Sequence, residues 1–178
     1  MGTQGTPFRT PPRALDYSSF MDQFGGVYEH SPWIARAVWQ QGLDERHDTV
    51  EGLGGVMANV LAQALDSDKL ALLRAHPELA AKAAVGRALT ADSTDEQAGA
   101  GLDQCSEHEY ERFMSLNARY NERFGFPFIM AVKGCHRTEI LAEFERRVNN
   151  DRETEFATAL DQVNRIARLR LEVIAGVR

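Results

Sequence analysis

The sequence predicts an all-α fold, arranged as a single domain of several helices. Apolar residues recur with helical spacing through most of the chain, as in the series Val50, Leu53, Met57, Val60 and Leu61. Only residues 125–132 resemble a strand, and Pro127 argues against a position inside a sheet. The chain of 178 residues also has no internal repeat or linker, so we expect one hydrophobic core.

The first residues differ from the rest of the sequence. Residues 1–13 contain two Gly, three Pro and no periodic apolar pattern. We therefore expect a flexible leader over residues 1–13, followed by the helical domain over residues 14–178. The leader also lacks the apolar region of a signal peptide.

Capping residues predict where the helices of the first half begin. Ser18 or Ser19 is expected to cap a short helix that ends at Phe24. Ser31, followed by a proline at the first helical position, predicts a second helix that runs to about Gly42. The apolar period predicts a third helix over residues 49–65.

The sequence after residue 65 predicts further helices. Ser67 is expected to cap a helix that ends at His76. Ser106 with Glu109 has the spacing of a capping box and starts a long helix. That helix should reach about Arg123, and two more are expected over residues 138–149 and 154–174.

Composition and charge exclude several classes of partner. The net charge of −6 argues against nucleic acid or an anionic membrane, so an anionic ligand would need a local cation. No apolar run has the length needed to span a membrane. Cys105 and Cys135 form no C-x-x-C pair and no disulfide framework, which is typical of a reducing compartment. We expect a cytoplasmic protein.

Known cofactor motifs are missing from the sequence. It has no glycine-rich nucleotide loop and no G-x-S-x-G motif. Its five histidines lack the spacing of a local metal site. We therefore expect neither a cofactor nor a metal. The chemistry that the remaining polar residues can perform is acid–base catalysis on an anionic ligand.

His76 is the first candidate for that chemistry. It shares the apolar side of its helix with Leu72 and Leu73, and Pro77 ends the helix directly after it. A helix C-terminus favours the protonated imidazole. The alternative is a histidine that is simply hydrogen-bonded in the core.

Polar residues follow at the predicted start of another helix. Ser93 and Glu96 have the S-x-x-E spacing of a capping box, with Gln97 next to them. Glu96 either serves a catalytic site or only returns a hydrogen bond to the backbone of Ser93.

Two further features have a structural and a functional interpretation. Asn117 and Asn121 fall on the apolar face of their helix, where they are candidates to hold the backbone of residues 125–132. The backbone groups of that segment are either bound by such neighbours or left to bind the polar edge of a ligand. Arg170 falls within the apolar face of the last helix. It forms either a structural salt bridge or a clamp for an anion.

Five segments together resemble the 2-oxo-4-hydroxy-4-carboxy-5-ureidoimidazoline (OHCU) decarboxylases of urate degradation. They are FGGVYEHSPWIARAVW, RAHPELAAKA, LTADSTDEQAGAGL, LNARYNERFGFPFIMAVKG and RIARLRLEVI. The resemblance implies a multi-helix, all-α fold of the OHCU decarboxylase type, which is usually dimeric and needs no cofactor. It implies conversion of OHCU to (S)-allantoin and CO2.

The resemblance also implies roles for individual residues. His76 matches the catalytic histidine of the family. We expect it to be the proton donor, with Glu96 as a second catalytic group that helps to manage protons. The substrate-binding positions match Pro77, Ser93, Glu96, Gln97, Phe128, Ile129, Met130, Ala131, Val132 and Arg170. Two other functions stay open: a helical binding module without turnover, and an enzyme that acts on another ureido-substituted acid.

Overall fold

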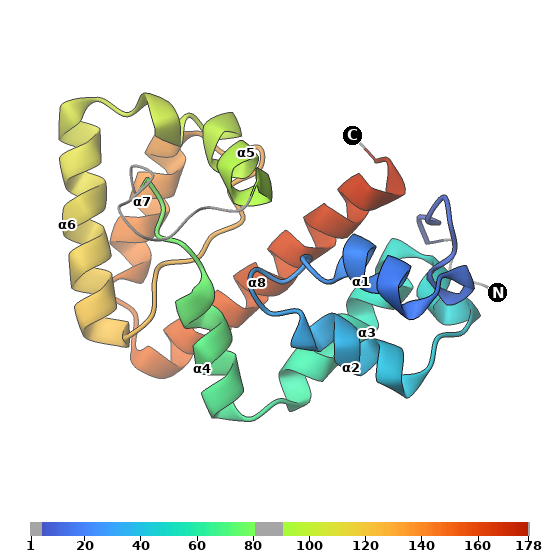
Figure 1. Cartoon of the computed structure of the whole chain (residues 1–178). Coiled ribbons are helices and arrows are strands. Elements are labelled where there is room, and N and C mark those ends of the chain that lie inside the picture. Colours follow the sequence, from blue (N-terminus) through green and yellow to red (C-terminus); the bar gives the residue numbers. More distant parts are fainter. Residues whose placement is uncertain (1–4, 81–90, 178) are drawn as a thin grey trace. The chain divides into compact units, whose positions relative to one another are not determined.

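The computed structural model describes residues 5–80 and 91–177, apart from the side chains of residues 91, 93 and 94. Within these ranges the chain forms eight α-helices and no strand beyond one isolated bridge between Pro7 and Thr49 (Figure 1). The all-α prediction is therefore confirmed. The chain divides into two compact units, which the sequence did not predict: unit 1 is Met1–Leu72 with Asn164–Arg178, and unit 2 is Leu73–Val163.

Unit 1 contains the N-terminal helices and the second half of the last helix. These are η1 (Pro12–Ala14), α1 (Tyr17–Phe24), α2 (Trp33–Gln41), η2 (Glu45–Asp48), α3 (Val50–Gln63), most of α4 (Asp66–Ala75) and the end of α8 (Arg152–Ala175). Their apolar faces supply a core whose residues are at most 1% exposed, including Phe20, Phe24, Ile34, Val38, Val50, Leu53, Met57 and Leu171. The helix predicted over residues 49–65 is thus confirmed as α3.

The described part of the predicted leader belongs to unit 1 and packs against other residues of that unit. The Phe8 amide donates to the Asp48 carbonyl at 3.1 Å, and the Thr6 amide donates to the Glu51 carboxylate at 2.8 Å. The Phe8 ring is buried edge-on against Phe24, with 5.2 Å between ring centroids. Residues 1–4 lie outside the described part of the chain, and the boundary at residue 13 stays a prediction.

Two predicted serine caps near the N-terminus are wrong. Helix α1 is capped by Asp16, whose carboxylate accepts from the Ser19 amide at 2.8 Å, so Ser18 and Ser19 lie inside the helix. The Ser31 hydroxyl donates to the Glu29 carbonyl at 3.1 Å instead of capping α2. At α1 an aspartate before the predicted cap binds the terminal amide, and at α2 the Ser31 hydroxyl binds a preceding carbonyl instead of a helix amide.

Unit 2 is built on two long helices that lie side by side, α6 (Glu107–Phe124) and α7 (Arg137–Arg147) (Figure 1). The unit also contains the end of α4, α5 (Ala91–Gly99), η3 (Leu102–Gln104) and the first half of α8. The capping box of Ser106 and Glu109 at the start of α6 is confirmed. Helix α4 begins at Asp66, so Ser67 is an interior residue and not its cap.

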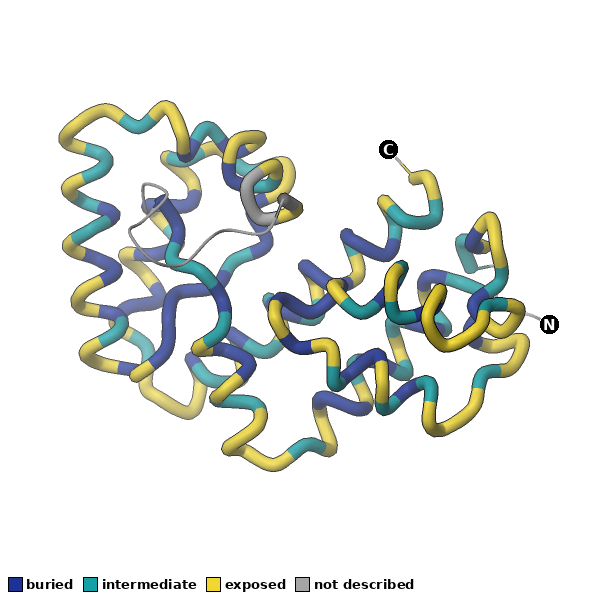
Figure 2. Tube along the Cα trace, viewed as in Figure 1, coloured by how far each residue is buried: buried dark blue, intermediate teal, exposed yellow. Residues whose placement is uncertain are grey.

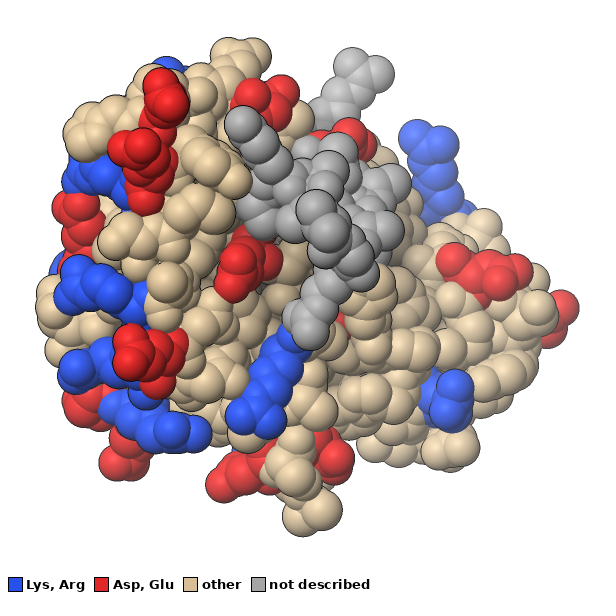
Figure 3. All heavy atoms as spheres, turned by 60° about the vertical axis from the view of Figure 1, so that its left-hand side comes forward, with Lys and Arg blue, Asp and Glu red and all other residues tan. Residues whose placement is uncertain are grey.

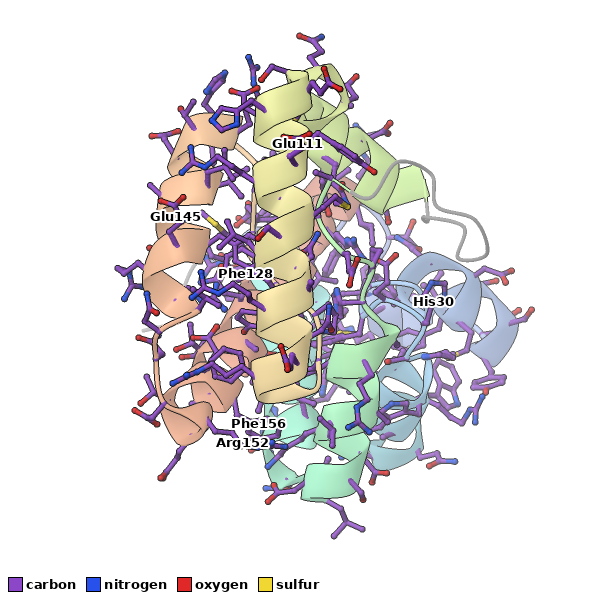
Figure 4. The ribbon with its side chains drawn as sticks, turned by 90° about the vertical axis from the view of Figure 1, so that its left-hand side faces the viewer. His30, Glu111, Phe128, Glu145, Arg152 and Phe156 are labelled. Carbon is purple, nitrogen blue, oxygen red and sulfur yellow. The ribbon has the colours of Figure 1, made fainter. Side chains whose placement is uncertain are left out.

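Aromatic side chains fill the space between α6 and α7. Phe128, in the connection between these helices, lies between them (Figure 4). It stacks on Phe144 with ring centroids 3.9 Å apart, and Tyr120 lies edge-on to Phe128 at 5.5 Å. This connection runs through unit 2 as a mostly buried segment (Figure 2). The core therefore holds an irregular segment in place without a sheet.

The surface of α6 and α7 carries both signs of charge. Arg112 pairs with Glu145 across the two helices, and Arg146 pairs with Glu143 at 2.5 Å on α7. Positive and negative side chains alternate on this side of the unit (Figure 3). In the part of the chain that the structure describes, no helix is both long and apolar enough to cross a membrane.

Candidate active site

His76 lies directly after the last residue of α4, as predicted. Its amide donates to the Leu73 carbonyl at 3.2 Å, and its side chain is buried at 6% exposure. Leu72 and Leu73 are also buried. Pro77 has no amide hydrogen with which to continue the helix, which fixes the imidazole at the C-terminal end.

The segment after Pro77 is held by amide side chains from two helices. The Asn121 side chain on α6 donates to the Glu78 carboxylate at 2.5 Å, and Asn117 donates to the Leu79 carbonyl at 3.0 Å. From α5, the Gln97 side-chain oxygen accepts from the Ala80 amide at 3.2 Å. These bonds fix the chain two to four residues beyond His76.

The predicted hydrogen-bond partner of the two asparagines was therefore wrong. Asn117 and Asn121 bind residues 78 and 79, which follow the histidine, and not the backbone of residues 125–132. Ala80 has a φ of 55°, in the left-handed region that few residues other than glycine adopt. Backbone strain of this kind persists where the surroundings impose it, as the Gln97 and Asn117 bonds do here.

The capping box predicted at Ser93 is also wrong. Helix α5 begins at Ala91, so Ser93 and Glu96 both lie inside the helix. The S-x-x-E spacing equals about one helical turn and also occurs in a helix interior. Glu96 is half-buried and Gln97 is buried, while the Ser93 side chain lies outside the described part.

The segment Phe128–Val132 is an irregular connection fixed by side chains. Its Ile129 carbonyl accepts from the Arg147 guanidinium at 2.8 Å, and its Ala131 amide donates to the Gln162 side chain at 2.9 Å. Four of its five residues are buried, and Met130 is partly exposed. At the start of this connection, Arg74 on α4 donates to the Gly125 carbonyl at 2.8 Å, which links the connection to the helix that ends just before His76.

A buried ion pair supports that segment. Arg147 and Glu155 are at most 1% exposed, and their side chains meet at 2.5 Å. The Tyr120 hydroxyl donates to the same carboxylate at 2.5 Å. Burial raises the pKa of Tyr120 well above its usual range, so the phenol keeps its proton.

Sequence reasoning missed this pair, although one signal was present. Arg147 falls on the apolar face of α7 with Ile140 and Phe144, as Arg170 does on α8. A buried cation on such a face needs a partner. Glu155 is eight residues away in another helix, so no local spacing identifies it.

Arg170 belongs to unit 1, whereas the other predicted site residues belong to unit 2. It lies 2.8 Å from the Glu29 carboxylate, and both side chains are buried. Its guanidinium also donates to the Val27 carbonyl at 3.5 Å. Of the two interpretations of Arg170, the structural salt bridge is thus present, and contact with a ligand stays a prediction.

Unit 2 also contains a cavity of about 530 Å³. Its lining residues are Ala80, Gln97, Leu102, Asp103, Cys105, Glu107, Tyr110 and Glu111. Among the lining residues that the structure describes, Gln97 is the only predicted site residue, and the three carboxylates suit an anionic ligand poorly. In the described ranges, no group of three or more His, Cys, Asp or Glu residues could hold a metal ion.

Comparisons with known proteins point to one family. The family model described as OHCU decarboxylase matches residues 13–172. An OHCU decarboxylase of Haloferax volcanii is 45% identical over 157 residues, which cover 88% of this chain and 89% of that protein. One of Halalkalicoccus jeotgali is 43% identical over 163 residues, with 92% and 89% covered.

Two solved structures share the fold. A crystal structure of (S)-allantoin synthase matches with a TM-score of 0.72 and 31% identity. The match covers 92% of this chain and 52% of the chain in that crystal structure. An OHCU decarboxylase crystallised in the presence of (S)-allantoin matches with a TM-score of 0.67 over 90% of this chain and 99% of that one, at 19% identity. Helices, motifs and relatives agree: the chain belongs to the OHCU decarboxylase family.

Proposed function

We propose that this protein is a carboxy-lyase that converts OHCU to (S)-allantoin and CO2 in urate degradation. The relatives that carry the name OHCU decarboxylase support this reaction. The observation that carries it is the position of His76: a buried imidazole at the end of α4, next to a segment that α5 and α6 hold by three side-chain hydrogen bonds.

The proposed chemistry needs an electron sink, which the substrate itself provides. As CO2 leaves, the electron pair of the breaking carbon–carbon bond forms a double bond to the ring carbon that bears the ureido group, and the C=N electrons move onto the ring nitrogen, which takes up a proton. The hydroxyl group then loses its proton to become the carbonyl of the product, while a proton is delivered to one face of the carbon that bears the ureido group. The proposed enzyme accordingly works without a cofactor or metal.

The site residues have separate roles in this proposal. His76 donates the proton, and Glu96 shares the management of protons with it. Pro77, Ser93 and Gln97 line the substrate. The backbone groups of Phe128–Val132 bind its polar ring and ureido edges. Arg170, as a forked donor, binds a carboxylate or carbonyl.

We also propose the setting in which the enzyme works. The family resemblance supports a homodimer, and the two cysteines without a disulfide are in accord with a reducing cytoplasm. The net charge of −6 argues against binding to nucleic acid or to an anionic membrane.

The test is CO2 release from freshly generated OHCU by purified protein treated with EDTA. We expect release well above the spontaneous rate, with no change after chelation. Loss of activity that one added metal restores would contradict the cofactor-free reaction. Binding of substrate without turnover would favour a helical binding module.

A further inference from the structure

We propose that Arg147 and Gln162 are positioning residues that hold Phe128–Val132 in the shape that binds substrate. This inference rests on the proposed function, because that segment is its backbone-binding element. Neither residue belongs to the site that the motifs predict. The argument concerns unit 2 alone, since α7, α8 up to Val163 and the segment all belong to it.

Arg147 makes contact with two consecutive residues of the segment. Its Nη1 donates to the Ile129 carbonyl at 2.8 Å, and its guanidinium lies 4.3 Å from the centre of the Phe128 ring. Glu155 holds the guanidinium from another side, through Nε at 2.8 Å and Nη2 at 2.5 Å. Glu155 therefore holds the Arg147 guanidinium in one orientation, and in that orientation its remaining donor reaches the segment.

Gln162 provides the second anchor, from α8. Its side-chain oxygen accepts from the Ala131 amide at 2.9 Å. An amide has one hydrogen, so the Ala131 amide is already occupied and a ligand must use other backbone groups. Gln162 is partly exposed, so replacing it disturbs the core less than replacing Arg147.

The two anchors lie on either side of Met130. Met130 is the least buried residue of the five, and no described residue hydrogen-bonds to its backbone. The segment has no strand partner among the described residues, so side chains must supply its fixed shape. The anchored neighbours therefore present the Met130 amide and carbonyl in a constant position.

Gln162 is the residue to test, because loss of the buried Arg147 would endanger folding. Gln162→Leu removes the acceptor at similar size, and Gln162→Glu keeps an acceptor for the Ala131 amide. Gln63→Leu, at an exposed position on α3, is the matched control. The measurements are amide hydrogen exchange of Ala131 by NMR without substrate, and steady-state kinetics with OHCU.

We expect Gln162→Leu to speed Ala131 exchange and to raise KM by about tenfold, with kcat within about threefold of the wild type. Gln162→Glu should restore both values, and Gln63→Leu should change neither. Faster exchange with unchanged KM would overturn the positioning role, as would unchanged exchange. A wild type that does not decarboxylate OHCU would instead overturn the proposed function, and the substrate role of the segment with it.

Discussion

The Nη2 atom of Arg170 lies 2.8 Å from Oε2 of Glu29, and neither side chain reaches the solvent appreciably. Glu29 lies in the connection between α1 and α2, and the next residue, His30, has a φ of 50°. The ion pair thus ties this connection to the last helix. In a buried position each charge helps to compensate the other.

Replacing Arg170 alone should therefore destabilise unit 1. Arg170→Met keeps the bulk but breaks the buried ion pair with Glu29 by removing one partner, which typically costs about 3–5 kcal/mol. Denaturant unfolding measures this loss. An unfolding free energy within about 0.5 kcal/mol of the wild type would show that the pair is not a structural element.

The double variant Arg170→Met with Glu29→Met separates stability from catalysis. Two apolar side chains in place of a buried ion pair are often neutral, so most of the lost stability should return. If Arg170 also binds the substrate, the double variant should be folded and stable but inactive. Full activity there would limit Arg170 to its salt bridge.

His76→Asn should lower kcat by about 10²-fold or more, the usual scale for a positioned acid or base. The melting temperature should change little because asparagine retains hydrogen-bonding groups at the helix end. His108→Asn, at an exposed position on α6, is the matched control and should be fully active. Near-normal kcat in His76→Asn would return His76 to the role of a core histidine.

Glu96→Gln tests the second proposed proton-handling group. Since α5 begins at Ala91, a capping role no longer accounts for Glu96. We expect a stable variant with strongly reduced kcat, because only the charge and the titrating group are lost. Asp95→Asn changes the adjacent exposed carboxylate in the same way and should be active. If Glu96→Gln were as active as a fully active Asp95→Asn, Glu96 would have no part in the chemistry.

Local signals in the sequence predicted much of the fold. The apolar period of residues 50–63 and the capping box of Ser106 and Glu109 each involve groups within one or two helical turns. The same rule failed at Ser93, because a one-turn spacing does not distinguish a helix start from a helix interior. Boundaries depend on which polar group finally binds the terminal amides, as Asp16 does at α1.

The supports of the site depend on contacts between distant residues. Asn117 was recognised as a buried polar residue, yet its partner Leu79 is 38 residues away and was misassigned. Arg147 reaches Ile129, and Gln162 reaches Ala131 from 31 residues away. Such pairs follow from how the helices pack, which no spacing rule in one sequence encodes.

Acid should weaken unit 2 partly through Glu109. Hydrogen bonds from the Ser106 amide and Arg137 hold the pKa of Glu109 below its usual value of 4.5. A carboxyl whose folded pKa is depressed stabilises the fold above its unfolded pKa, and this contribution disappears as the pH falls through the folded pKa. Urea unfolding at pH 6 and pH 3 should therefore show a smaller loss in Glu109→Gln than in the wild type. An equal or larger loss in the variant would contradict this role.

The optical activity of the product tests the central claim most directly. Wild-type protein mixed with freshly generated OHCU should produce allantoin enriched in the S enantiomer, because a group fixed in the site delivers the proton to one face. Circular dichroism of the product solution measures that enrichment as the reaction proceeds, with a protein-free sample as reference. Racemic allantoin, formed no faster than in the protein-free sample, would contradict the assignment of this chain as the decarboxylase.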